Sequence, residues 1–360
     1  MLVLLLACAG PDDGAPAPGT PYYAPDVPGP FLAGTAEATF AGPGSDAQPV
    51  QVWFPATEAD EDLYAYDDLF AGTAREDASP ACDTARPVLV FSHGNGGVRY
   101  QSIFLAERLA THGWLVVAPD HVGNTIFDDG GATLAELLLR RPLDVAATFD
   151  WLADTDADGL LAGCVDPADG FAVAGHSFGG YTALVVGGAT LDAAASAAWC
   201  ETATDEWLCD DFAAAMAAEG AATLDRSDAR AWAVAPMAPA AYEVLVGGLG
   251  DIAVPALVLG GSLDTLTPIA TQVEPIYRGL GARPRALGVL EGAGHFSFSN
   301  ACDMLPTYEE CDPPFRPNAE THPIIATAVT AFLRNVRGDA QAAAWLPDPD
   351  EATLLWEEAE

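Results

Sequence analysis

Apolar residues in this chain occur as short unbroken runs that alternate with longer segments of helical period. The unbroken runs cover residues 87–91, 114–119, 171–174, 231–236, 255–260 and 286–290. Runs of this kind are typical of strands buried on both faces in a parallel sheet. Helical periods occupy residues 99–112, 134–139, 145–152, 268–280 and 322–336, and Pro142 interrupts the second and third. The alternation predicts an α/β fold with a mostly parallel central sheet and helices on both faces.

Three regions depart from this alternation. Near the start, residues 35–40 and 50–55 predict an antiparallel pair of strands. The acidic residues 56–85 have no period and are expected to form a surface loop. The Ala-rich residues 191–230 are expected to form a helical insertion, or a cap over the site. No internal repeat is visible. Because single α/β domains often run this long, residues 31–360 are interpreted as one domain.

The sequence around Ser177 has the form of a nucleophile elbow. Residues 175–179 read Gly-His-Ser-Phe-Gly, follow the run 171–174 and lead into the apolar residues 181–186. In a strand-to-helix turn of this kind the serine hydroxyl projects above the sheet edge, and the glycines remove side chains that would collide with backbone. The helix start adds free N–H groups and a positive dipole end. Ser177 is therefore the predicted nucleophile.

A serine hydroxyl needs a base within hydrogen-bond reach and an acid that fixes the tautomer of that base. In the elbow architecture the acid and then the histidine follow the serine. Asp264 and His295 each follow a predicted strand directly, which places both at carboxyl ends of strands. The rival acids are weaker candidates, because Asp251 precedes its strand and Glu291 is too near His295 in sequence to turn back onto it.

Two more loops leave the carboxyl ends of predicted strands. Residues 92–97 form a glycine-rich turn whose backbone N–H groups can approach a ligand closely. Residues 120–125 follow the next strand, where α/β folds form pockets. His93, His121 and His176 are expected to support these loops rather than to transfer protons. The candidate residues of the substrate pocket are Gly94, His121, Val122 and Phe296.

Charge narrows the range of functions. Of 360 residues, 52 are acidic and 14 are basic, for a formal net charge of −38. Such a field repels nucleic acid and anionic membrane surfaces. All the basic residues are arginine, so no lysine can form a Schiff base. No cofactor is expected.

The first residues resemble a targeting segment. Residues 1–8 are apolar but too short to span a bilayer. They end in Leu-Leu-Ala-Cys, which resembles a bacterial lipobox in which Cys8 is acylated; an ordinary apolar leader is the alternative. Residues 9–30 are rich in Pro, Gly, Ala and Asp and are expected to form a flexible tether. The protein is thus expected to be exported, either as a cell-envelope lipoprotein or as a secreted protein.

The cysteines fit an oxidising compartment. Setting Cys8 aside leaves six, an even number. Their spacing favours Cys200 with Cys209 and Cys302 with Cys311, which leaves Cys82 for Cys164. Metal binding is the rival interpretation, but neither a C-x-x-C spacing nor a His pair accompanies the cysteines, and no metal site is predicted.

Residues 154–159 imitate the beginning of a calcium loop. An EF-hand loop needs a glutamate six residues after its glycine, and Val165 stands at that position. An acidic surface loop is the favoured interpretation, with calcium binding as the alternative.

The motifs together resemble an enzyme superfamily. Residues 91–97, 118–125, 174–180 and 291–296 look like motifs of α/β-hydrolases labelled predicted dienelactone hydrolases. The set is similar also to platelet-activating-factor acetylhydrolases and, more distantly, to cutinase-like polyesterases, over about residues 31–338. The resemblance implies an α/β-hydrolase fold with Ser177 as nucleophile, Asp264 as acid, His295 as base, and the N–H groups of Asn95 and Phe178 as the oxyanion hole. True dienelactone hydrolases use a cysteine nucleophile, and this chain departs from them there.

The resemblance implies a serine hydrolase that cleaves carboxylic esters through an acyl-enzyme, and the leader and cysteines predict that it is exported. The expected substrates are small-molecule or polymeric esters, whether of lipid, short-chain or polyester type. An acyltransferase or a peptidase on the same triad is an alternative. A non-catalytic lipoprotein binding module is another, although degenerate members usually lose a triad residue and all three are present here.

Overall fold

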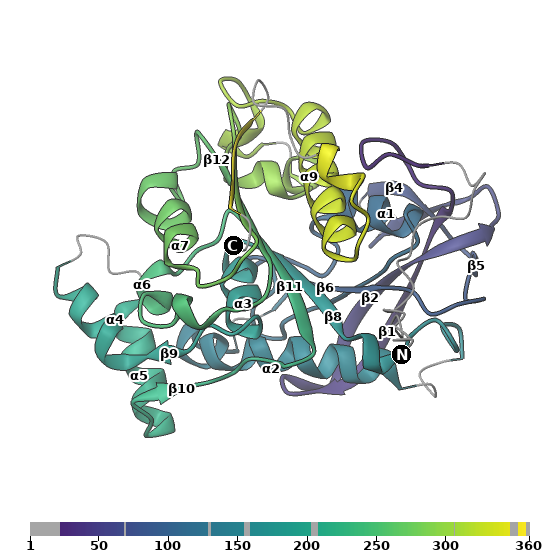
Figure 1. Ribbon diagram of the computed structural model, residues 1–360. Helices are drawn as coiled ribbons and strands as arrows, with labels where there is room; N and C mark the ends of the chain where they lie inside the picture. The colour runs from purple at the N-terminus through teal and green to yellow at the C-terminus, as the bar shows by residue number, and fades with distance from the viewer. Residues whose placement is uncertain are drawn as a thin grey trace, which may run out of the picture.

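One mixed β-sheet organises the chain. The computed structural model describes residues 22–67, 70–128, 131–154, 159–202, 208–305, 307–345 and 352–357. Within them the sheet has 12 strands in the order β14-β13-β12-β11-β8-β6-β7-β2-β1-β4-β3, with β5 paired to β2 (Figure 1). The strands are β1 (Leu32–Gly42), β2 (Ser45–Glu58), β3 (Leu63–Tyr66), β4 (Phe70–Arg75), β5 (Ser79–Pro80), β6 (Val88–Ser92), β7 (Leu115–Pro119), β8 (Phe171–His176), β11 (Ala231–Met237), β12 (Ala256–Gly261), β13 (Arg285–Leu290) and β14 (Ala352–Glu357).

The central strands are parallel, as the unbroken apolar runs predicted. From β13 through β12, β11, β8 and β6 to β7, every neighbouring pair is parallel. Their residues are almost all buried, which explains why the runs show no polar alternation. The flanking strands β14 and β2 pair antiparallel with β13 and β7. The α/β class is confirmed, and so is the predicted antiparallel pair, now β1 and β2.

The prediction of a surface loop at residues 56–85 is wrong. This region contributes β3, β4 and β5, and Tyr66 in β3 is fully buried. The Tyr66 hydroxyl accepts a hydrogen bond from the Trp53 indole N–H and donates one to the Glu107 carboxylate. The same carboxylate accepts from Thr73. Aromatic and polar contacts between neighbouring strands stabilise these short strands. Such contacts leave no periodic pattern of apolar residues in the sequence, so the strands were not predicted.

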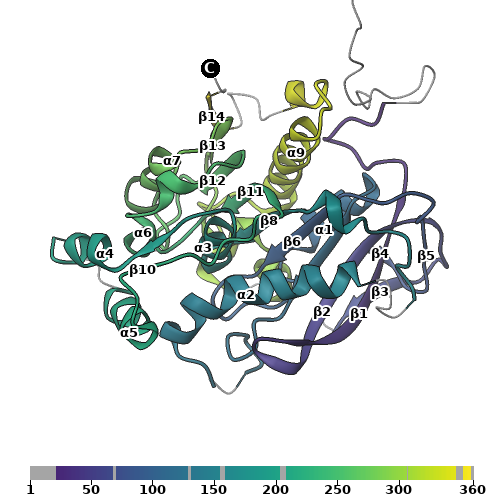
Figure 2. The same ribbon diagram turned by 60° about the horizontal axis from the view of Figure 1, so that its bottom comes forward.

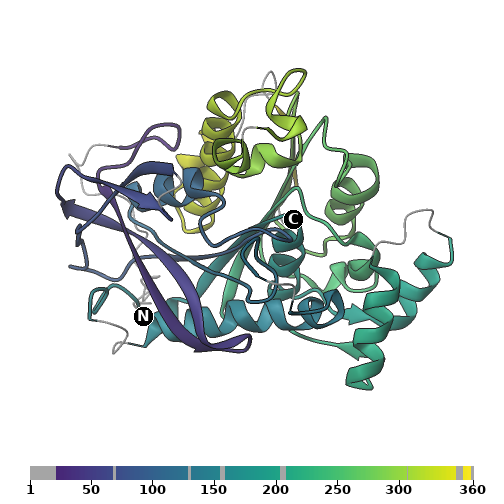
Figure 3. The same ribbon diagram turned by 180° about the vertical axis from the view of Figure 1, so that it is seen from behind.

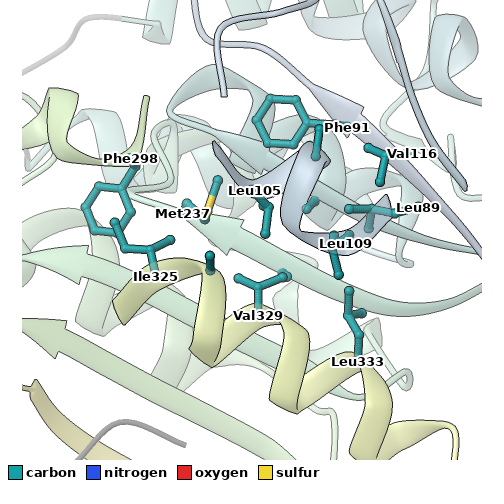
Figure 4. Close-up of a cluster of buried hydrophobic side chains, with 14 of the residues drawn as sticks. Leu89, Phe91, Leu105, Leu109, Val116, Met237, Phe298, Ile325, Val329 and Leu333 are labelled. Carbon is teal, nitrogen blue, oxygen red and sulfur yellow. The ribbon is translucent and has the colours of Figure 1, made fainter. Parts of the chain in front are cut away.

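Helices cover both faces of the sheet (Figures 1 and 2). On one face α1 (Ile103–Thr111) and α9 (Asn318–Val336) pack together over the strands. Figure 4 shows the resulting cluster, in which side chains of both helices meet Leu89, Phe91 and Met237. On the other face lie α2 (Leu134–Ala153) and α3 (Phe178–Val186). The other α-helices of the described residues are α4 (Ala193–Cys200), α5 (Cys209–Glu219) and α7 (Glu274–Gly279), with the single turns α6 (Tyr242–Leu245) and α8 (Ala301–Met304).

The predicted break at Pro142 does not occur, and α2 is one continuous helix. A proline inside a helix lacks the N–H that would bond the carbonyl four residues earlier, here that of Leu138. The Tyr181 hydroxyl from α3 donates to that carbonyl at 2.8 Å and supplies the missing bond. A contact from another helix therefore keeps α2 intact, and it could not be read from the local sequence.

Residues 191–230, where a helical insertion or cap is expected, add no strand to the main sheet in their described part. They contain α4, α5 and the small sheet of β9 (Leu191–Asp192) and β10 (Thr223–Leu224). Leu208, Phe212 and Met216 pack with side chains of α2 and α3. Figure 3 shows these teal helices at the opposite end of the molecule from the purple β1–β2 hairpin.

The end of the predicted tether lies against the folded body, which corrects that prediction for residues 22–30. Arg108 donates to the Pro25 carbonyl at 3.0 Å, the Val27 carbonyl bonds the His112 ring at 2.9 Å, and Arg334 donates to the Tyr23 carbonyl at 2.6 Å. Cys8 and the rest of residues 1–21 lie outside the described residues. Among the described residues, no helix combines the length and apolarity needed to cross a bilayer.

All three predicted disulfides are present: Cys82–Cys164, Cys200–Cys209 and Cys302–Cys311. Most of the segment that imitates a calcium loop, residues 155–158, lies outside the described residues. Within the described ones, no cluster of three or more His, Cys, Asp or Glu side chains is arranged to hold a metal.

The disulfides give the first prediction. Mass spectrometry of non-reduced digests should find the three linked peptide pairs, because each pair is bonded in the fold. Each of the two disulfides that join cysteines with a sequence separation of 9 should raise the free energy of unfolding by about 2–3 kcal/mol. Alkylation of all six cysteines in the denatured, unreduced protein would contradict the pairing.

Candidate active site

Ser177 occupies a strained turn between β8 and α3. Its backbone has φ 57° and ψ −119°, a left-handed conformation that costs a non-glycine residue free energy. Hydrogen bonds on both sides hold the turn: Ser177 N–H donates to the Met237 carbonyl at 2.9 Å, and the Ser177 carbonyl accepts from Gly180 and Ala240 at 2.8 and 3.1 Å. Neighbouring strands therefore fix the position of this serine.

The glycines of the motif are required by close backbone contacts. A Cβ on Gly179 would lie 1.9 Å from the Ser92 carbonyl oxygen of β6. A Cβ on Gly175 would lie 2.2 Å from the Gly179 carbonyl oxygen. Neither position can hold a side chain without moving a strand, so the turn depends on both glycines.

Asp264 and His295 are brought together from the loops after β12 and β13. The His295 Nδ1 atom bonds the Asp264 carboxylate at 2.9 Å, and both residues are about 5% exposed. The other Asp264 oxygen accepts from the N–H groups of Leu266 and Thr267 at 2.9 and 2.7 Å. Burial alone would raise the pKa of Asp264, but the bonds and charge of His295, with the bonds from Thr267, outweigh it and lower that pKa. A carboxylate that stays ionised and bonds Nδ1 leaves Nε2 free to act as a base.

Ser177 and His295 both line one cavity of about 700 Å³. Among the described residues, the side-chain hydrogen bonds of His295 run to Asp264 and Thr267, and none joins it to the Ser177 hydroxyl. Such nucleophile–base contacts are often looser before substrate binds. Of the predicted pocket residues, Gly94 and Phe296 line the cavity, as do Asn95 and His176.

His121 and Val122 are not on the cavity wall, which corrects that prediction. His121 is fully buried, with Nδ1 bonded to Asp144 and Nε2 to the Ser92 hydroxyl, each at 2.8 Å. Val122 lies in the same loop, where its carbonyl accepts from Arg140. The loop turns inward because the His121 side chain bonds Asp144 of α2 and Ser92 at the end of β6. The end of this loop does reach the cavity, through Ile126 and Phe127.

A buried arginine supports the glycine-rich turn from below. Arg141 of α2 is fully buried and donates to the His93 carbonyl and, at 2.6 Å, to the Asn124 side chain. Asn124 in turn donates to the Asn95 side chain at 2.7 Å. The Arg141 guanidinium also stacks on the Phe178 ring, 4.6 Å from its centroid. Burial lowers the pKa of Arg141 to about 9, so it remains charged at neutral pH.

Gln101 links three parts of the site. Its Oε1 accepts from Gly94 N–H at 3.0 Å, and its Nε2 donates to His176 Nδ1 at 2.8 Å. His176 Nε2 then donates to the His295 carbonyl at 3.0 Å. Burial, and then the nearby His295, lower the pKa of His176 to about 3, so its ring is neutral and one tautomer satisfies both bonds. The expected loop-supporting role of His176 agrees with this geometry.

A surface loop also holds the segment after His295. The Glu310 carboxylate accepts from Phe296 N–H at 2.9 Å, and Tyr308 stacks on Phe296 with centroids 4.8 Å apart. Glu310 precedes Cys311, so the Cys302–Cys311 bridge fixes the loop that carries both contacts. Burial raises the pKa of Glu310, and this effect outweighs the hydrogen bond from Phe296 N–H, which lowers that pKa.

Sequence reasoning missed the apolar rim of the cavity. Large apolar side chains on its wall are 38–60% exposed: Ile126, Phe127, Leu266, Leu305 and Tyr308. They come from three separate loops, so no single stretch signals them. An exposed cluster of this kind marks a surface that binds apolar partners.

The comparisons with known proteins find distant similarity to proteins named cutinases. No protein-family model matches the chain. "Cutinase est1" of Thermobifida alba is 28% identical over 210 residues, or 58% of this chain and 53% of the relative. "Cutinase 2" of Thermobifida cellulosilytica and "Cutinase cut1" of Thermobifida fusca are each 26% identical over the same share of this chain, and over 60% and 49% of their own lengths. The chain spans about half the length of the curated relatives it matches. This distant similarity and the α/β architecture are consistent with the α/β-hydrolase superfamily.

The Gln101 contacts give a prediction on stability. Replacing Gln101 by Leu should lower the free energy of unfolding by about 1–3 kcal/mol, because Gly94 N–H and His176 Nδ1 lose their partners while remaining buried. Urea denaturation measures this change. Gln341→Leu, at an exposed position, is the matched control and should change stability little. Equal effects in the two variants would refute the role of the Gln101 bonds.

Proposed function

We propose that the protein is a serine hydrolase that cleaves carboxylic esters through an acyl-enzyme on Ser177. The observation that carries this proposal is the Asp264–His295 pair on the wall of the cavity that also holds Ser177 in its strained turn. The names of the similar proteins, all cutinases, support ester hydrolysis. No feature of the described residues specifically favours acyl transfer, peptide cleavage or a non-catalytic binding role.

In the proposed reaction His295 Nε2 accepts the Ser177 hydroxyl proton as Oγ attacks the ester carbonyl. Asp264 holds Nδ1 protonated and stabilises the imidazolium that forms. His295 returns the proton to the leaving alcohol, and an ester bond to Ser177 remains. Water, deprotonated by His295, then hydrolyses that bond and releases the acid.

The oxyanion would be held by the N–H groups of Asn95 and Phe178. Phe178 is the first residue of α3, so its N–H points out of the helix start, beside Ser177. Asn95 lies on the glycine-rich turn, which the Arg141–Asn124 contacts hold in place. Preorganised donors of this kind contribute about 3–4 kcal/mol each to transition-state stabilisation.

The apolar rim indicates an uncharged, apolar ester as substrate. A wide cavity with exposed Phe127 and Leu266 at its mouth can take an extended chain that lies partly on the surface. This fits a polymeric or long-chain ester better than a small polar one. The three disulfides support an exported protein, and lipid attachment through Cys8 remains part of the proposal.

The assignment of the nucleophile is tested with Ser177→Ala. Hydrolysis of 4-nitrophenyl butyrate should fall by at least about 10⁴, and labelling by a fluorophosphonate probe should disappear. Ser45→Ala, in the β1–β2 hairpin, is the control and should keep both. Near-normal turnover in Ser177→Ala would remove this serine from the mechanism.

The assignment of the acid is tested with Asp264→Asn. The amide keeps the shape of the side chain but favours the wrong His295 tautomer, so kcat should fall by about 10⁴. Glu310→Gln is the comparison, because Glu310 is a second carboxylate that interacts with His295, and this substitution should lower kcat far less. If Glu310→Gln caused the larger loss, the acid would be Glu310.

A further inference from the structure

We infer that the cavity selects esters by charge: it accepts uncharged and cationic substrates and rejects those that carry a carboxylate, with Glu243 as the residue that sets this preference. The inference rests on the proposed esterase function and adds the discrimination against anionic esters and the residue that sets it. It follows from where the chain places its few cations and from one buried acid on the cavity wall.

No cation lies on the wall of the cavity. The chain has 14 basic residues, all arginine, and each is in the described part of the chain. None of them lines the cavity. The arginine that supports the glycine-rich turn, Arg141, is fully buried and directs its bonds to Ser92, His93 and Asn124. An anionic substrate would therefore find no opposite charge to pair with inside the cavity.

The wall instead carries a carboxylate. Glu243, at 2% exposure, lines the cavity from α6, two residues after Ala241, which also lines it. Gln272 lies beside it on the same wall, with Oε1 accepting from Tyr242 N–H at 2.8 Å. That bond fixes the amide so that Nε2 donates to Glu243, at 3.3 Å. The carboxylate is thus held in place against the cavity.

The surroundings reinforce the negative potential. Asp264 stands behind His295 and Glu310 behind Phe296, and the neutral ring of His176 adds no positive charge. The whole chain carries a formal charge of −38. In a cleft with low-dielectric walls such a field is focused, which lowers the local concentration of anions and their rate of entry.

The same field favours turnover of a neutral ester. Hydrolysis converts an uncharged substrate into a carboxylic acid that ionises on release. The product is then an anion. The negative field that disfavours entry of a carboxylate-bearing substrate therefore favours release of this product from the cavity. A diester would be cleaved to a half-ester anion, which is a poor substrate for a second cleavage at the same site.

The experiment compares three 4-nitrophenyl esters of similar length. They are the methyl ester of 4-nitrophenyl glutarate (uncharged), the free half-acid (anionic at pH 7.5), and 4-nitrophenyl 5-(trimethylammonio)pentanoate (cationic). At low ionic strength kcat/KM for the uncharged ester should exceed that for the half-acid by about tenfold or more. The ratio should fall as salt screens the field, and the cationic ester should not be disfavoured.

Two variants locate the source of the preference. Glu243→Gln should lower the ratio of uncharged to anionic kcat/KM by about threefold or more, since it removes the acidic group on the cavity wall while keeping the shape of the side chain. Asp251→Asn is the matched control: it removes the same charge from an exposed residue before β12, at the opposite edge of the sheet, and should leave the ratio unchanged. Leu266→Arg adds a cation to the exposed rim and should lower the ratio even if Glu243→Gln does not fold.

Each outcome decides a separate point. If no ester is hydrolysed in a Ser177-dependent way, the proposed function is wrong. If the uncharged ester is hydrolysed but the half-acid reacts equally well at low salt, the charge preference is wrong while the esterase stands. If the preference exists but Glu243→Gln behaves like Asp251→Asn, and Leu266→Arg alone changes the ratio, the role assigned to Glu243 is wrong.

Discussion

The approach of three backbones around Gly175 and Gly179 is the constraint on which the site depends. The Ser92 carbonyl of β6 touches the helix start at Gly179, so β6, β8 and α3 meet where no side chain fits. That contact places the glycine-rich turn after β6 beside the serine turn after β8. Ser177 keeps its strained backbone conformation because hydrogen bonds to Met237, in β11, and to Ala240, just after that strand, hold it in place.

Buried polar groups then hold loops that would otherwise move independently. Gln101 connects the turn at Gly94 to His176, and His176 connects to the segment of His295. Arg141 performs a similar role for the other side of the turn. Each group would cost free energy if it were unpaired, so the pairings favour a single arrangement of the loops. These bonds thus connect the loops that carry the candidate site residues.

Features that depend on neighbouring residues in the sequence could be predicted. Features that depend on contacts between segments distant in sequence could not. Ser177, Asp264 and His295 could be placed because each follows an apolar run whose end fixes its location. The inward turn of His121, the continuity of α2 at Pro142 and the strand at Tyr66 could not, since each depends on a partner remote in sequence: Asp144, Tyr181 or Glu107. The apolar rim was not predicted for the same reason, because its residues come from separate loops.

The scarcity of cations links the stability of the fold to its chemistry. Arginine can make several directed bonds at once, and this chain uses it as an internal cross-link. Arg99 joins Glu37 to Asp120, Arg285 donates to the carbonyls that end α7, and Arg334 pairs with Asp339 while it holds Tyr23. The chain has 14 basic and 52 acidic residues. Arginines that make these internal contacts cannot also pair with the acidic residues near the cavity. The composition that keeps the surface strongly acidic thus also leaves the cavity without a positive side chain, and its charge preference follows from that distribution.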